Sequence, residues 1–196
     1  PLKMTAMSRG KANYTEWVGR IDNWIGARLD RRLLRDTVSY DRAEAFVRMS
    51  RWRDEGILIT HRAKGIEAAM EEYLHREPPV VLVSPVVVRG WDLVQDQCRG
   101  LAIGKLPFPS VKDPLVKARA RMDPDYPFEV AIKTLQQMCG RPVRGVGDWA
   151  EIIVFDGDAG NWFWKRYGYL ANQWFRDAWG ETADILPRPR KLGVKE

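Results

Sequence analysis

Val80-Val-Leu-Val83 is the stretch that decides the fold, because all four of its residues are apolar. A strand that is apolar at every position is typical of a parallel sheet covered by helices on both faces. A second apolar stretch, Gly56-Ile-Leu-Ile-Thr60, precedes it. The residues between the two stretches have the three- and four-residue apolar spacing of a helix, from Lys64 to Leu74. This strand–helix–strand order predicts that the two strands pair in parallel.

The same alternation continues on both sides of this unit. We expect further strands over 33–38, 99–106 and 152–155, and helices over 41–53, 113–121, 126–141, 158–167 and 169–179. A helix with an apolar stripe from Tyr14 to Leu29 comes first, and Asn13 with Glu16 is placed to cap its start. The order predicts an α/β fold, a three-layer α/β/α domain with a mostly parallel sheet, an extra N-terminal helix and aromatic C-terminal helices.

Length and composition fit one domain. The 196 residues are 45% hydrophobic and include nine Trp, which is enough apolar material for a core. We expect 1–32 to form an N-terminal extension and helix packed on the domain, 33–180 to form the domain, and 181–196 to form a basic tail. The net charge of +6 suits a polyanionic partner, although many basic proteins bind no nucleic acid.

Compartment and metal content are predicted from what the sequence lacks. No apolar run reaches the ~18 residues of a membrane span, and there is no signal peptide, so we expect a cytoplasmic protein with no membrane partner. The two His and two Cys show no metal-ligand spacing, so we expect no metal site.

Gln137-Met-Cys-Gly140-Arg141-Pro-Val-Arg144 carries the sharpest chemical signal. On a helix, Gln137 and Arg141 lie four residues apart and share a face, and Arg144 would follow. Arginine binds phosphate oxygens in a fixed fork, and Gly140 would let a ligand come close. From spacing alone, a solvated helix face with two arginines is an equal alternative. Pro142 leaves the place of Arg144 on that face open.

Open parallel sheets bind ligands at the carboxyl ends of their strands. The turns after Ser39, His61, Ser84 and Phe155 are therefore the expected places for chemistry, and we expect the two guanidiniums to be aimed out of the same edge. For His61, a loop histidine with a local hydrogen bond is the slightly favoured alternative to a DNA contact.

Four stretches together resemble one protein family. The segment Q-x-x-G-R-x-x-R resembles motif VI of superfamily 2 helicases. In the DinG/XPD branch of that superfamily, motif IV is similar to Thr37–Ala43, motif V to Val83–Asp92, and the segment after motif V to Ile103–Phe108 with Asp113-Pro114. The resemblance implies the second RecA-like motor domain of an ATP-dependent DNA helicase.

The resemblance also implies roles for the matching residues. Arg141 and Arg144 would be arginine fingers for ATP bound by a first RecA-like domain, and Gln137 would orient its terminal phosphate. The implied nucleotide-binding residues are Gly90, Asp92 and Gly140. The implied contacts to single-stranded DNA are Ser39, Tyr40, His61, Ser84 and Lys105.

The sequence contains no G-x-x-x-x-G-K-[ST] loop and no acidic box of the D-E-A-H type. Gly100-Leu-Ala-Ile-Gly-Lys105 is similar to such a loop, but it has three spacer residues and Leu106 in place of the hydroxyl, so we interpret it as a strand. ATP and Mg²⁺ are therefore expected to be bound mainly by the first domain, and this chain alone should not hydrolyse ATP. The alternative is a non-catalytic module of the same fold that binds nucleic acid or a protein.

Aromatic and basic residues alternate over Asn161–Tyr167. Nucleic-acid bases could stack there, but we favour packing of the terminal helices onto the sheet.

Overall fold

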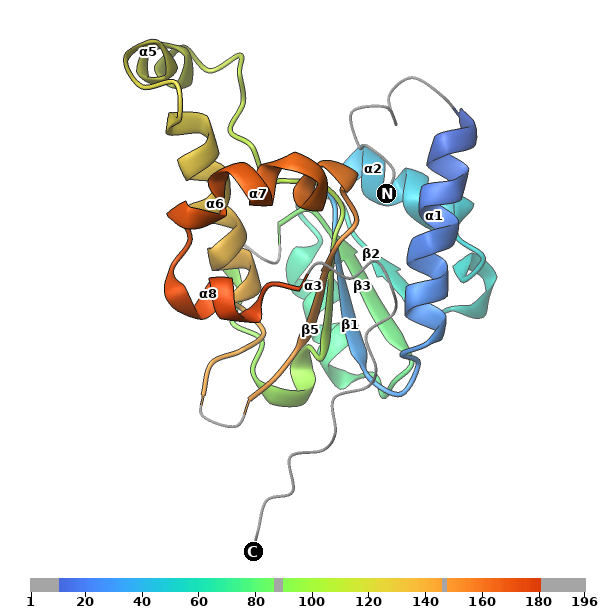
Figure 1. Cartoon of the computed structure of the whole chain (residues 1–196). Coiled ribbons are helices and arrows are strands. Elements are labelled where there is room, and N and C mark those ends of the chain that lie inside the picture. Colours follow the sequence, from blue (N-terminus) through green and yellow to red (C-terminus); the bar gives the residue numbers. More distant parts are fainter. Residues whose placement is uncertain (1–10, 87–89, 146–147, 181–196) are drawn as a thin grey trace, which may run out of the picture.

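The computed structural model describes residues 11–86, 90–145 and 148–180. Its centre is a five-stranded sheet of order β2-β3-β1-β4-β5 in which every neighbouring pair is parallel (Figure 1). The strands are β1 (Arg32–Asp36), β2 (Leu58–Thr60), β3 (Val80–Ser84), β4 (Gly100–Ile103) and β5 (Glu151–Val154). The deciding stretch forms β3, which is buried along its whole length between β1 and β2. This confirms the predicted parallel α/β sheet.

Helices cover both faces of the sheet. The first face carries α1 (Lys11–Gly26) and α2 (Tyr40–Met49), followed by the turn η2 (Arg53–Glu55). The second face carries α3 (Ile66–His75), α6 (Tyr126–Cys139), α7 (Trp164–Tyr167) and α8 (Gln173–Ala178), with the short turns η3 (Gln95–Gln97), η4 (Ala159–Phe163) and η5 (Gly168–Leu170). Helix α5 (Pro114–Met122) stands away from the sheet at the start of α6 (Figure 1).

Helix α1 packs against the sheet and is bonded to the segment that follows α2. Its predicted apolar stripe is confirmed, since Trp17, Ile21 and Ile25 are buried against the first face. Near its C-terminus, Asp22 accepts hydrogen bonds from the Ser50 hydroxyl (2.6 Å) and the Arg51 backbone N–H (2.9 Å). The predicted cap at Asn13 is wrong, because α1 already includes Lys11 and Asn13 lies inside the helix.

A buried ion-pair cluster joins the segment after α1 to the last strand. Arg28 and Arg31 both contact the carboxylate of Glu151, the first residue of β5, with 3.5 Å between Arg31 Nη1 and Glu151 Oε1. All three side chains are buried. The cluster therefore holds the edge strand and the end of α1 together at the amino end of the sheet.

The aromatic C-terminal segment packs against α6, as favoured from the sequence. Tyr167 stacks on Phe128 with ring centroids 4.0 Å apart, and Trp164 stacks on Trp179 at 4.2 Å. The predicted helix over 158–167 is divided into the π-helical turn η4 and α7. The helix predicted over 169–179 is divided into η5 and α8.

Candidate functional site at the end of α6

Helix α6 delivers the arginine segment to the surface. Its last turn is continued by Gly140, whose N–H donates to the Gln136 carbonyl (2.9 Å), and by Arg141, whose N–H donates to the Met138 carbonyl (3.2 Å). Pro142 is buried and the chain leaves the helix there. The Leu93 N–H donates to the Arg141 carbonyl at 3.4 Å, and this bond fixes the turn against the segment that follows β3.

Both arginines form ion pairs with the same carboxylate. Arg141 Nη1 donates to Asp92 Oδ1 at 2.8 Å, and Arg144 Nη2 donates to the same oxygen. The side chains are open to solvent, at 26% exposure for Arg141, 39% for Arg144 and 58% for Asp92. The hydrogen bonds from Arg141 and then Arg144 hold the pKa of Asp92 below its ordinary value. Two guanidiniums therefore converge on one anionic oxygen at the surface.

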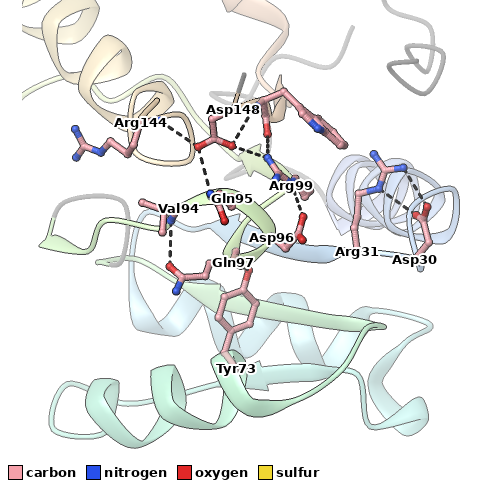
Figure 2. A network of polar contacts seen from close by, with 11 residues as sticks. Asp30, Arg31, Tyr73, Val94, Gln95, Asp96, Gln97, Arg99, Arg144 and Asp148 are labelled. Atoms are coloured by element: carbon pink, nitrogen blue, oxygen red, sulfur yellow. Dashed lines mark hydrogen bonds and ion pairs between the residues drawn. The ribbon is translucent and has the colours of Figure 1, made fainter. Parts of the chain in front are cut away.

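Asp148 fixes the backbone that carries Arg144. Its carboxylate accepts the backbone N–H groups of Arg144 (3.2 Å), Gln95 (3.3 Å) and Trp149 (2.9 Å), and the guanidinium of Arg99 (2.6 Å), as Figure 2 shows. Burial raises the pKa of Asp148, but these hydrogen bonds outweigh it and the pKa is lowered. The side chain of Asp148 is almost fully buried, so its role is to position the loop.

Gln137 and Arg141 share an open groove of about 660 Å³, which confirms that they lie on one face of α6. The groove runs along α6 and reaches the loop after β4. Its lining comprises Val38, Pro107, Phe108, Pro109, Ser110, Val130, Thr134, Gln137, Met138 and Arg141. It therefore joins the arginine segment to the carboxyl edge of the sheet, where Val38 follows β1.

The arginines do not lie at the carboxyl edge, and that expectation is wrong. Arg144 is linked through Asp148 to Arg99, and the Arg99 N–H donates to the carbonyl of Arg32, the first residue of β1. The reason is the direction of α6, which returns after β4 and runs antiparallel to the strands (Figure 1). Its C-terminal residues therefore lie near the amino ends.

Four of the predicted residues lie together at the carboxyl edge of the sheet. His61 follows β2 directly, and its Nε2 lies 2.8 Å from Ser84 Oγ at the end of β3. The Tyr40 ring meets the His61 ring edge-on at 5.5 Å, and the Ser39 hydroxyl caps α2 by accepting the Arg42 N–H. Ser39 and Tyr40 are half-buried, whereas His61 and Ser84 are buried. His61 Nδ1 also lies 2.9 Å from the Arg62 carbonyl, the local bond that the alternative interpretation expects.

A family model described as "Helicase C-terminal domain" matches residues 31–178. The chain belongs to this helicase family. The match supports the DinG/XPD-like resemblance and agrees with the RecA-like three-layer fold. No curated protein gives a significant match to the chain. As a helicase C-terminal domain, it is a second motor domain, of a class that works with nucleic acid, a nucleotide and a partner domain.

Three further predicted residues of the helicase domain are Lys105, Gly90 and Gly140. Lys105 is half-buried just after β4, at the same edge as His61. Gly90 is exposed, and a Cβ there would meet nothing within 4 Å; part of the predicted motif V, residues 87–89, lies outside the described residues. Gly140 has helical backbone angles, and a Cβ would lie 3.3 Å from the Gln136 carbonyl oxygen. A larger side chain at position 140 would therefore be opposed by contact with the Gln136 carbonyl rather than by the backbone conformation.

The donor set at the end of α6 can bind an anion. It consists of the two solvent-accessible guanidiniums of Arg141 and Arg144 and the amide of Gln137, all of which can donate to anionic oxygens. Within the described ranges, no group of three or more His, Cys, Asp or Glu could hold a metal ion. In the same ranges, no helix is both long and apolar enough to cross a membrane.

Sequence reasoning missed the residues that support the arginines. Asp148 and Arg99 organise the loop, and Arg99 also lies over the Trp149 ring at 4.8 Å. Asp148-Trp149 also resembles the segment that follows motif VI in this helicase branch, and that resemblance is the sequence signal that could have found Asp148.

Proposed function

We propose that this domain is the second motor lobe of a DinG/XPD-like, ATP-dependent DNA helicase, in which Arg141 and Arg144 act as arginine fingers. The observation that carries the proposal is the convergence of both guanidiniums on Asp92 Oδ1 at the exposed end of α6. A carboxylate oxygen and a phosphate oxygen are equivalent acceptors for an arginine fork. The spacing that serves Asp92 therefore also serves the terminal phosphate of ATP held by a first lobe.

Asp92 acts as the resting partner of the two arginines. When the lobes close, Arg141 and Arg144 exchange Asp92 for phosphate oxygens, which carry more negative charge at the transition state. Gln137 lies beside Arg141 in the groove and orients the same phosphate. Gly90 and Gly140 flank this exchange, and ATP with Mg²⁺ is bound mainly by the first lobe, which supplies the phosphate loop and the metal-binding carboxylate.

Single-stranded DNA is placed at the carboxyl edge. Tyr40 and Ser39 are the accessible contacts, and Lys105 adds a positive charge beside them. The hydroxyl of Ser84 is occupied by His61 and by the Val86 N–H at 3.2 Å. We therefore assign Ser84 and His61 to holding Tyr40 and the strand ends in position. The groove along α6 connects this edge to Arg141 and provides the path by which nucleotide state alters the grip on DNA.

We also propose a division of the chain. The motor domain spans 33–180, the N-terminal extension and helix span 1–32, and the basic tail spans 181–196. The tail and residues 1–10 lie outside the described residues.

The test is ATP hydrolysis by a protein that joins this chain to a first lobe with a phosphate-binding loop. Arg141→Ala and Arg144→Ala should each lower the DNA-stimulated rate by about 10³- to 10⁵-fold, the usual effect of removing an arginine finger. Arg53→Ala is the matched control, because Arg53 is an exposed arginine that pairs with its neighbour Asp54. Turnover within a few-fold of the control in both variants would refute the assignment.

One observation favours a second candidate, a non-catalytic binding module. Asp92 already pairs with both arginines, so a purely structural ion-pair cluster also accounts for their geometry. A binding module should hold single-stranded DNA alone, with an affinity that falls steeply with salt. Binding that requires ATP and the first lobe would favour the motor over the module.

A further inference from the structure

The two arginines are held in place in different ways. Arg141 continues the last turn of α6, where its N–H donates to the Met138 carbonyl at 3.2 Å and its carbonyl accepts the Leu93 N–H at 3.4 Å. Arg144 lies beyond the end of the helix, and its backbone N–H donates to Asp148 Oδ2 at 3.2 Å. The position of Arg144 therefore depends on a side chain, whereas that of Arg141 follows from helix geometry.

One oxygen of Asp148 joins two segments that are far apart in the sequence. Asp148 Oδ2 accepts the N–H of Arg144 and, at 3.3 Å, the N–H of Gln95 in the turn η3 (Figure 2). Gln95 has a φ of 51°, a left-handed conformation that residues other than glycine rarely adopt and that persists when surrounding contacts impose it. Gln95 follows Asp92 closely in the chain. Asp148 therefore fixes the segment that carries Asp92 and the backbone of Arg144 to each other.

The other oxygen of Asp148 is occupied by a charged donor. Asp148 Oδ1 accepts the Arg99 guanidinium at 2.6 Å and the Trp149 N–H at 2.9 Å. The Arg99 guanidinium also donates to the Trp149 carbonyl at 2.7 Å and lies 4.8 Å from the centre of the Trp149 ring. The Asp148 side chain is 6% exposed. The carboxylate therefore has a fixed orientation, with one oxygen toward Arg99 and the other toward the two backbone N–H groups.

We propose that Asp148 is a positioning residue for Arg144 and not for Arg141: it clamps the backbone of Arg144 to the segment that carries Asp92. The consequence of this clamp for ATP hydrolysis rests on the proposed function, but the clamp itself does not. Asp148→Asn has one acceptor oxygen instead of two. That oxygen would stay with Arg99, because an NH₂ group there would face a charged donor. The N–H groups of Arg144 and Gln95 would then lose their acceptor.

The first test is an NMR titration of the Asp92 carboxylate in the 196-residue chain, without ATP and without a first lobe. Asp148→Asn should raise the pKa of Asp92 by about as much as Arg144→Ala does, because the hydrogen bond from Arg144 helps to lower that pKa. The pKa should remain below its ordinary value, since Arg141 still donates. In the double variant the two rises should not add, because both changes remove the same contact. Full addition of the two rises, or an unchanged pKa in Asp148→Asn, would overturn the proposal.

Asp96→Asn is the matched control for this titration. Asp96 lies in η3 and pairs with the same guanidinium, at 2.8 Å from Arg99 Nε, but its side chain is 86% exposed. The substitution takes one carboxylate from Arg99 and leaves Asp148 in place, so the pKa of Asp92 should keep its wild-type value. A rise equal to that in Asp148→Asn would overturn the proposal, because lost charge beside Arg99 would then explain both.

The second test measures ATP hydrolysis by the two-lobed protein. Asp148→Asn should lower the DNA-stimulated kcat by about 10²-fold, the cost of a displaced catalytic group, with little change in KM for ATP, because the arginines act on the transition state. Asp96→Asn should keep the wild-type kcat. If Arg144→Ala abolished turnover while Asp148→Asn matched this control, the clamp would be refuted and the motor function would stand. If Arg144→Ala left turnover intact, the motor function would fail, and the titration would still decide on the clamp.

Hydrogen exchange in the wild-type chain tests the clamp even if Asp148→Asn does not fold. The backbone N–H groups of Arg144 and Gln95 should both be protected, because each donates to a buried carboxylate. Exchange of the Arg144 N–H at the rate of an unfolded peptide would overturn the proposal.

Discussion

At the scale of residues, Asp92 is the side chain whose state reports on the arginine pair. The hydrogen bonds from Arg141 and Arg144 lower the pKa of Asp92 in the folded protein. The ion pair between Asp92 and the arginines is therefore fully formed above the ordinary Asp pKa. It is lost as the pH falls through the lower pKa of the folded state. In Arg141→Ala, we expect the Asp92 pKa to rise toward its ordinary value, because the first of the two donors is gone. Carbon-detected NMR titration of the carboxylate measures this, and an unchanged pKa would contradict the pairing.

The residue scale also shows what the sequence could and could not predict. The four-residue spacing placed Gln137 and Arg141 correctly on one face of α6, because helix geometry is local. The partner of Arg141 could not be predicted by spacing, since Asp92 lies 49 residues away. The same holds for Asp148, whose bonds to Gln95 and Arg99 form only when two distant loops meet.

At the scale of elements, the buried cluster of Arg28, Arg31 and Glu151 joins α1 to β5. Glu151→Gln would remove the buried carboxylate that Arg28 and Arg31 share, while Arg31 would keep its ion pair with Asp30. We expect a loss of about 3–5 kcal/mol in the free energy of unfolding. Glu129→Gln is the control, because its partner Lys133 is exposed and such surface pairs contribute about 0–1 kcal/mol. Urea denaturation measures both. A loss below about 1 kcal/mol for Glu151→Gln would show that the cluster does not anchor α1.

The aromatic elements at the C-terminus give a second prediction. Phe163 of η4 is fully buried between Phe108 and Tyr167, so Phe163→Ala should cost about 3–5 kcal/mol of stability. Trp174→Ala should change stability by only about 0.5 kcal/mol, because Trp174 is half-exposed on α8. Equal losses in the two variants, measured by thermal unfolding, would contradict the packing role of η4.

Element order was predicted well from the sequence, whereas the edge of the sheet that carries the arginines was not. Apolar strands such as β3 are recognisable because both of their faces are covered. The place of Arg141 depends on the direction of α6 across the sheet, which is a tertiary property. His61 and Ser84 lie at the carboxyl edge because each comes at the end of a strand. The arginine segment lies near the amino ends instead, because a helix that returns from the carboxyl edge ends at the opposite one.

At the scale of the whole molecule, the groove along α6 runs from Arg141 to Val38 at the carboxyl edge. The proposed function assigns the Arg141 end to nucleotide and Tyr40, at the carboxyl edge, to DNA. Tyr40→Ala should therefore weaken binding of single-stranded DNA by the two-lobed protein by about 5- to 150-fold, equivalent to about 1–3 kcal/mol for a lost stacking contact. Without DNA, its basal ATP hydrolysis should stay unchanged, because Tyr40 is remote from the arginines. Fluorescence anisotropy with a labelled oligonucleotide and a parallel ATPase assay measure the two effects. A fall in basal hydrolysis with unchanged DNA affinity would contradict this division.

The exchange of Asp92 for phosphate is tested most directly by nitrogen-15 NMR of the arginine side chains in the two-lobed protein. On addition of ADP with beryllium fluoride, a mimic of the terminal phosphate, the side-chain resonances of Arg141 and Arg144 should shift, while that of Arg53 should not. The proposed role would be contradicted if the resonances of Arg141 and Arg144 kept their nucleotide-free positions when the protein is saturated with this nucleotide.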